Sequence, residues 1–86
     1  MKVYQVYAVF DNLTEAFLAP NFIETEEEAK RLFQHQINSI PLWKDNASDF
    51  DLYQLGHYDA KSGTLVSELH KIAKGTAVLR RENEEE

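Results

Sequence analysis

Residues 2–10 alternate in the manner of a β-strand, and both of the resulting faces are mostly apolar. The residues predicted on one face are Tyr4, Val6, Ala8 and Phe10, and those on the other are Val3, Gln5, Tyr7 and Val9. A strand with one face in water shows a cleaner alternation of apolar and polar side chains. We therefore expect this strand to be central in its sheet, or to meet a partner with its second face.

A turn and an edge segment are expected next. Residues 11–15 are rich in Asp and Asn, whose side chains form hydrogen bonds with the nearby backbone. Residues 16–22 return to apolar character but contain Pro20, which has no N–H to donate to a neighbouring strand. This segment is predicted to be an edge strand or a short extended arm.

A helix is predicted from Thr25 to about Ser39. Thr25 can cap the first turn, and Glu28 stands where its side chain can bond back to that cap. Apolar residues then recur at helical spacing, at Ala29, Leu32, Phe33, Ile37 and Ile40. Pro41 disfavours helical backbone at the residue before it, so we expect the helix to end there and residues 42–48 to form a loop.

A second pair of strands is predicted over residues 50–58 and 64–69, joined by a hairpin loop at residues 59–63. In the first of these strands, Phe50, Leu52, Gln54 and Tyr58 are predicted to share one face, with Tyr53, Leu55 and His57 on the other. Gly56 interrupts the pattern and predicts a bulge or a close backbone approach. Residues 70–80 are compatible with a short helix or an extended arm.

The two predicted hairpins share a short repeat. Phe10-Asp11 and Tyr58-Asp59 each precede two variable residues, a hydroxyl residue and an apolar return. The repeat supports the order β-hairpin, helix, β-hairpin. We therefore predict an α+β fold, a small antiparallel sheet of ββαββ order with one helix packed on one face. Residues 1–81 are expected to form a single domain and residues 82–86 a disordered acidic tail.

Composition narrows the class of protein. The chain has 86 residues, no cysteine and a net charge of −6. A disulfide-built secreted miniprotein and a thiolate metal site are excluded, and nothing in the sequence predicts a signal peptide or a membrane span. The cytosol is the expected compartment. A fold of this size has a thin core, so partner subunits are a common source of stability.

Catalytic chemistry is not expected. No histidine is spaced with a second ligand as on a metal-binding helix, and there is no glycine-rich phosphate loop. Asp49 and Asp59 flank a predicted strand, where aspartate usually makes turns or caps. The prediction is a protein that acts by binding, without enzymatic activity, metal or cofactor.

Binding candidates fall into two groups. An apolar second sheet face favours a homodimer, with predicted interface residues Tyr7, Val9, Tyr53 and Leu55. Alternatively, strand aromatics on an open face could stack nucleobases. The predicted nucleic-acid-binding residues are Lys30, Arg31, Trp43, Lys71, Lys74, Arg80 and Arg81. Trp43 has two interpretations, a recognition residue in a loop or a cap on the edge of the core.

Several stretches resemble one known family. They are the sequences Val-Phe-Asp at residues 9–11, Ala-Lys-Arg-Leu-Phe at 29–33, Asp-Phe-Asp-Leu-Tyr at 49–53 and Leu-Gly-His-Tyr-Asp at 55–59. Together they resemble the small nonstructural protein of gokushoviruses, single-stranded DNA phages of the microvirus group. The resemblance covers residues 3–69.

This resemblance implies a phage protein made in the cytoplasm of the bacterial host and absent from the virion. It also implies single-stranded DNA binding or assistance in phage genome replication. The alternative is a homodimeric interaction module that regulates phage or host replication proteins without binding nucleic acid. The expected partners are therefore a second copy of the chain, single-stranded DNA, and phage or host replication proteins, with no membrane.

Overall fold

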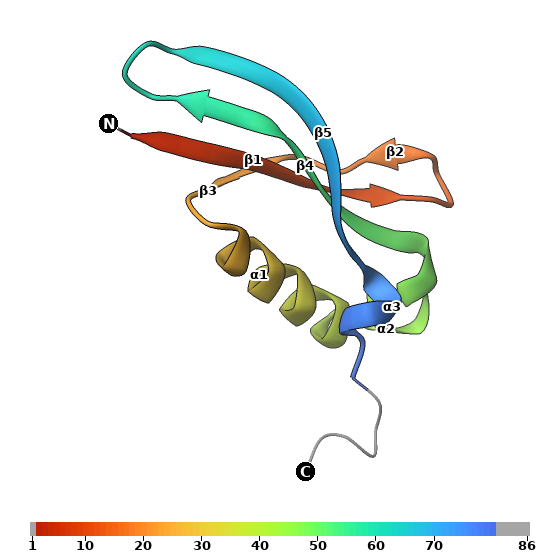
Figure 1. Ribbon diagram of the computed structural model, residues 1–86. Coiled ribbons are helices and arrows are strands. Elements are labelled where there is room, and N and C mark those ends of the chain that lie inside the picture. The colour runs from red at the N-terminus through yellow and green to blue at the C-terminus, as the bar shows by residue number, and fades with distance from the viewer. Residues whose placement is uncertain (1, 81–86) are drawn as a thin grey trace.

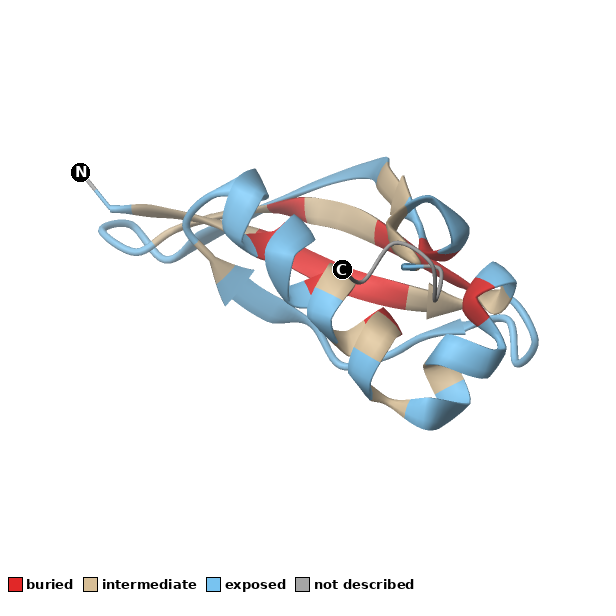
Figure 2. Ribbon diagram, turned by 90° about the horizontal axis from the view of Figure 1, so that it is seen from below, coloured by how far each residue is buried: buried red, intermediate tan, exposed pale blue. Residues whose placement is uncertain are grey.

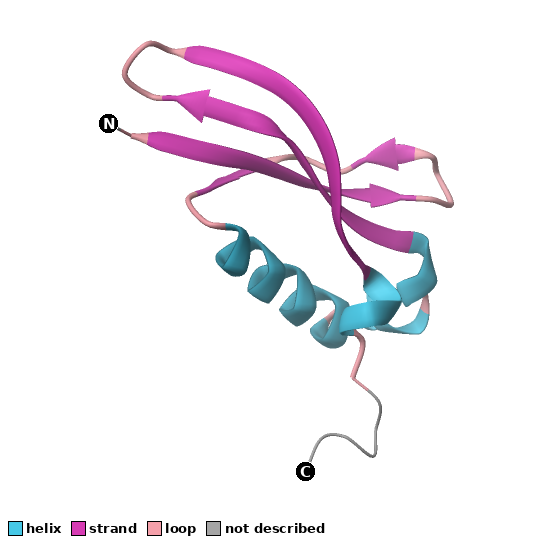
Figure 3. Cartoon of the chain, in the orientation of Figure 1, coloured by secondary structure: helices cyan, strands magenta, loops and turns pink. Residues whose placement is uncertain are grey.

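The computed structural model describes residues 2–80, which form an antiparallel sheet with helices on one side (Figures 1 and 3). The strands are β1 (Val3–Asp11), β2 (Ala16–Phe17), β3 (Asn21–Ile23), β4 (Phe50–Asp59) and β5 (Thr64–Lys74). The helical elements are α1 (Glu26–Ser39), α2 (Pro41–Asp45), the 3-10 turn η1 (Ala47–Asp49) and α3 (Gly75–Val78). The predicted α+β class and the antiparallel sheet are confirmed. The acidic tail predicted at residues 82–86 lies outside the described residues.

The central strand of the sheet is β1. It pairs with β4 along one edge, giving the order β2-β1-β4-β5. Along its other edge, β2 pairs with the C-terminal end of β1 and β3 pairs with residues 5–7. Pro20 lies between β2 and β3, where the chain leaves the ladder. The expectation that β1 is an inner strand is met, because it has paired strands on both edges; its alternate residues face α1 on one side and the opposite face of the sheet on the other.

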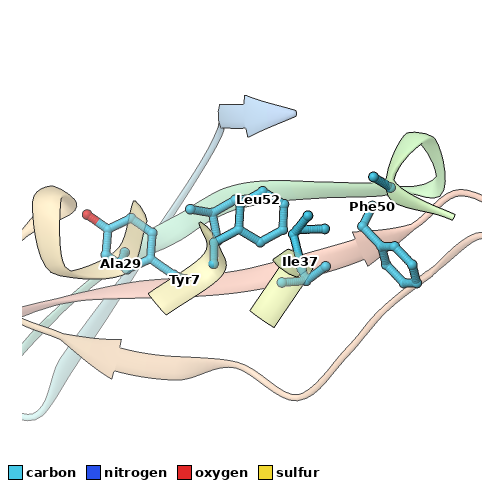
Figure 4. Close-up of a cluster of buried hydrophobic side chains, with 8 residues drawn as sticks. Tyr7, Ala29, Ile37, Phe50 and Leu52 are labelled. Carbon is cyan, nitrogen blue, oxygen red and sulfur yellow. The ribbon is translucent and has the colours of Figure 1, made fainter. Parts of the chain in front are cut away.

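The face of the sheet toward α1 carries the core. Tyr7 and Val9 from β1 and Phe50 and Leu52 from β4 pack against α1, whose contribution includes Phe33, 1% exposed, and Ile37, fully buried (Figure 4). Figure 2 shows the buried segments of the central strands behind α1. Burial raises the pKa of the Tyr7 hydroxyl above its ordinary value, and the carboxylates of Glu26 and Glu27 raise it further.

Two of the predicted dimer-interface residues belong to this core. Tyr7 is 2% exposed and Val9 is 8% exposed, and both are part of the core cluster of their own chain. The structure therefore places their side chains on the face toward α1 and not on the open face. Tyr53 and Leu55, the other two predicted interface residues, are only half-buried and lie outside this core cluster.

Helix α1 begins as its sequence predicts. The Thr25 side chain accepts a hydrogen bond from the Glu28 backbone N–H at 3.2 Å and donates to the Glu28 carboxylate. The three glutamates of the first turn lie at the positive end of the helix dipole. The helix ends at Ser39, but Pro41 then starts α2 rather than a loop, because proline is well suited to the first position of a helix.

The two hairpins use the same turn. The Asp11 carboxylate accepts a hydrogen bond from the Leu13 N–H, and the Asp59 carboxylate accepts one from the Lys61 N–H, each at 2.9 Å. The N–H four residues after each aspartate donates back to the aspartate carbonyl, from Glu15 and from Gly63, at 2.7 Å. These two residues have positive φ, 60° and 77°. The short sequence repeat thus corresponds to a repeated backbone structure.

Candidate binding surface on the open face of the sheet

A bulge at Gly56 decides which side chains of β4 reach the open face, the face opposite α1. Val6 pairs with Gly56 and Tyr7 with Gln54, so Leu55 is an extra residue in β4. Gly56 has a φ of 152°, and a β-carbon there would lie 1.9 Å from the Val66 carbonyl oxygen. The predicted bulge and close approach are therefore both present.

The bulge also corrects the predicted faces of the second half of β4. Tyr58 pairs with Tyr4, and His57 pairs with Gln5. Tyr58 therefore lies on the open face with Tyr4, and His57 lies on the side of the core face, the reverse of the prediction. An unbroken alternation through residue 56 gave the wrong assignment because the extra residue shifts the pattern by one.

An aromatic row crosses the open face. Phe10 on β1, Phe17 on β2 and Tyr53 on β4 contact one another edge to face. The ring centroids are 4.7 Å apart for Phe10 and Phe17, 5.4 Å for Phe17 and Tyr53, and 6.1 Å for Phe10 and Tyr53. Phe17 is 41% exposed, Phe10 and Tyr53 are half-buried, and no helix within residues 2–80 covers this side of the sheet (Figure 1). Aromatic side chains on an uncovered sheet face can stack with planar groups such as nucleobases.

Lys71 extends this row onto β5. It pairs with Tyr53 across the strands, and its Nζ lies 5.7 Å from the centre of the Tyr53 ring. The same Nζ is 3.6 Å from the carboxylate of Asp51, which also accepts a hydrogen bond from the Asn12 side chain at 3.0 Å. Asp51 is 8% exposed while Lys71 stays exposed. We define the aromatic row as Phe10, Phe17, Tyr53 and Lys71.

A second aromatic pair lies nearer the N-terminal end of β1. Phe22 on β3 and Tyr58 on β4 are 5.6 Å apart at 89°. Lys2 lies 5.8 Å from the Tyr4 ring and pairs with Glu24 at 3.1 Å. That ion pair is exposed on both sides, so its contribution to stability is small.

The predicted cations do not form one basic strip. Lys30 pairs with Glu26 at 3.0 Å on α1, and Arg31 also lies on α1, away from the aromatic row. Lys74 ends β5, and the turn of α3 then carries the chain to α1, where the Arg80 N–H donates to the Asn38 side chain at 2.7 Å. Arg81 lies outside the described residues. Among the predicted residues that the structure describes, Lys71 alone joins the aromatic row.

Trp43 belongs to the core. Its ring stacks on Phe50, with centroids 4.6 Å apart and planes 15° apart, and it packs against the core cluster. The geometry therefore supports the interpretation of Trp43 as a cap on the core. Trp43 packs on the core side of the sheet, whereas the aromatic row lies on the open face.

Cavities and titratable clusters add no further chemistry. A half-open cavity of about 270 Å³ lies between α1 and residues 18–21, with Leu18 and Leu32 among its mostly apolar lining. Within residues 2–80, no group of three His, Asp or Glu side chains is close enough to hold a metal ion. No helix among these residues is long and apolar enough to cross a membrane.

Phe10 and Phe17 were not among the residues predicted to bind. The signal that identifies them is the pairing of Phe10 with Phe17 in the first hairpin. The repeated turn implies this pairing, but strand alternation alone does not favour it over other aromatic pairs.

Comparison with known proteins identifies the family of the chain. Neither the curated proteins nor the solved structures give a match. The model of the family described as Phage ORF5 protein matches residues 4–78, which include all five strands apart from Val3 at the start of β1. This chain therefore belongs to the Phage ORF5 protein family.

Proposed function

We propose that this phage-encoded protein is non-enzymatic and binds single-stranded DNA through the aromatic row, in support of phage genome replication. The observation that carries the proposal is the row itself, three mutually contacting aromatic side chains and a lysine across an uncovered antiparallel sheet. Sheets with aromatics on the face opposite their helices are a recurrent design for stacking unpaired bases. The site of action would be the cytoplasm of the bacterial host, outside the virion, as the resemblance to gokushovirus nonstructural proteins implies.

The charges set the expected mode of binding. The chain has a net charge of −6, and Lys71 is the cation of the row. Base stacking would therefore supply most of the affinity, at roughly 1–3 kcal/mol per base. With few phosphate contacts, the logarithm of the affinity should fall only slowly with the logarithm of salt concentration, since each contact contributes about −0.7 to the slope for single strands.

The test is a fluorescence-anisotropy titration of a labelled oligothymidylate at low and at moderate salt. Phe17→Ala and Tyr53→Ala should each weaken binding roughly 5- to 150-fold, the equivalent of the stacking energy of one base. Lys71→Ala should weaken binding and flatten the salt dependence. Leu42→Ala is the matched control, because Leu42 is 66% exposed on α2, away from the row.

The second candidate function is a protein-interaction module for phage or host replication proteins. It is favoured by the shortage of cations on the open face, since an apolar protein interface does not need them. The same titration separates the two proposals. If the wild-type chain does not bind the oligonucleotide at low salt, the DNA proposal is abandoned and the interaction module takes its place.

A further inference from the structure

We propose that a second copy of the chain docks on the outer part of the β4–β5 hairpin, which we call the arm and define as residues 55–69. The arm extends past α1, so no helix covers it on either side (Figure 1). All residues from 60 to 69 are exposed, although β5 is an eleven-residue strand. A hairpin in this position has no packing layer of its own.

Three side chains of β5 within the arm are apolar and exposed, where solvent would favour polar ones. Leu65 is 66% exposed, Leu69 is 58% exposed and Val66 is 41% exposed. Leu65 pairs with Tyr58, and strand alternation places Leu69 on the same face of β5, whereas Val66 pairs with His57 and lies on the other face. Two exposed leucines on one face of an uncovered hairpin indicate an interaction surface in a soluble protein.

A groove lies beside these leucines. Its volume is about 170 Å³, and it is lined by Val6, Leu55, Gly56, Leu65, Val66 and Ser67. Gly56, one of the lining residues, has no side chain, and its backbone lies against the backbone of Val66. Protruding leucines and a groove on one surface make that surface complementary to itself, which is the requirement for a two-fold contact between identical chains.

Charge supports a second copy as the occupant. None of the six residues that line the groove is ionisable. Glu68, which lies between the two leucines in sequence, points to the other face by alternation and approaches His70 at 3.5 Å. Two chains that each carry a charge of −6 can therefore meet here without bringing like charges together. The predicted homodimer residue Leu55 is part of this surface, whereas Tyr7 and Val9 are not.

The test measures mass in solution by light scattering at tens of micromolar protein. The wild-type chain should have twice the mass of one chain, and Leu65→Glu and Leu69→Glu should each have the mass of one. Leu42→Glu is the matched control, because Leu42 is as exposed as Leu65 but lies on α2, and this variant should remain dimeric. Thermal melts of all three variants verify that each is folded.

A second measurement locates the contact. The chain has no cysteine, so Ser67→Cys introduces a unique thiol in the groove, and Ser48→Cys introduces one on η1 as the control. Alkylation of Cys at position 67 should slow as the protein is concentrated, while alkylation at position 48 should not. A monomeric wild-type chain or a monomeric Leu42→Glu variant would overturn the proposal. So would alkylation rates at positions 67 and 48 that respond equally to protein concentration. The outcome does not depend on DNA binding, so the two proposals fail separately.

Discussion

The two faces of the sheet use the same strands for different purposes. On the face toward α1, Tyr7, Val9 and Leu52 are buried with Phe33 and Ile37, and their contacts contribute to the free energy of folding. On the open face, Phe10, Phe17 and Tyr53 contact one another; Phe17 is exposed and the other two are half-buried. Because neighbouring residues of β1 point to opposite faces, adjacent positions should respond to substitution in opposite ways. Loss of a side chain on one face should unfold the protein, and loss on the other should spare the fold and remove binding.

The largest effect is expected at Phe33. This side chain is 1% exposed in the centre of the core, so Phe33→Ala should destabilise the fold by about 3–5 kcal/mol. For a small domain this is a large share of the total stability. Leu32→Ala is the control on the same helix, because Leu32 is 40% exposed, and it should cost far less. Urea unfolding of both variants is the measurement; equal losses would show that α1 does not distinguish the two positions.

A smaller loss is expected at the bulge that sets the faces of β4. Gly56→Ala places a β-carbon 1.9 Å from the Val66 carbonyl oxygen at a φ of 152°, so the backbone must shift, at a cost of about 2–4 kcal/mol. Gly63→Ala is the matched control. Gly63 also has positive φ but no atom within 4 Å of the added carbon, so only about 1 kcal/mol is expected. Similar melting temperatures for the two variants would contradict the close approach at Gly56.

The third prediction concerns the polar contact that joins the first turn to β4 beside the aromatic row. The Asn12 side chain donates to the Asp51 carboxylate and to the Asp49 carbonyl, each at 3.0 Å. Asn12→Ala removes a donor from a buried carboxylate and should cost about 1–2 kcal/mol. Leu13→Ala, at the 77% exposed tip of the same turn, should be close to neutral. Thermal denaturation compares the two variants. An unaltered melting temperature for Asn12→Ala would show that this hydrogen bond does not stabilise the fold and that the ion pair with Lys71 is enough for the Asp51 carboxylate.

The smallest effect is a gain in stability. Glu15 has a φ of 60° at the position that Gly63 occupies in the second hairpin. Left-handed backbone costs a non-glycine residue roughly 1–2 kcal/mol, and glycine returns part of this through its greater freedom in the unfolded chain. Glu15→Gly should therefore stabilise the protein by about 0.5 kcal/mol. The melting temperature should rise slightly; a fall would show that the two turns differ in more than this residue.

Sequence reasoning succeeded where the signal is local. The cap at Thr25, the alternation along β1 and the turns at Asp11 and Asp59 each depend on residues within one or two turns of chain. It failed where the structure depends on residues that are distant in the sequence. The extra residue at Leu55 reversed the faces of His57 and Tyr58, and a bulge is defined by its partner strand.

The candidate site shows the same limit. Lys71 and Arg80 are close in the sequence and share a segment without acids, but β5 and α3 direct them to different layers. Conversely, Phe10 and Tyr53 are far apart in sequence and touch. The assignment of Trp43 also required the packing, because only its stacking on Phe50 chooses between the two interpretations.

The central position of β1 has a consequence for synthesis of the chain. This strand is synthesised before its long partner β4, and residues 12–49 separate the two. Closing so long a loop is slow compared with forming a hairpin, so β4 and β5 can pair locally before β1 docks between its neighbours. Until then both apolar faces of β1 are unprotected, and the nascent chain is at its most prone to aggregate in that interval.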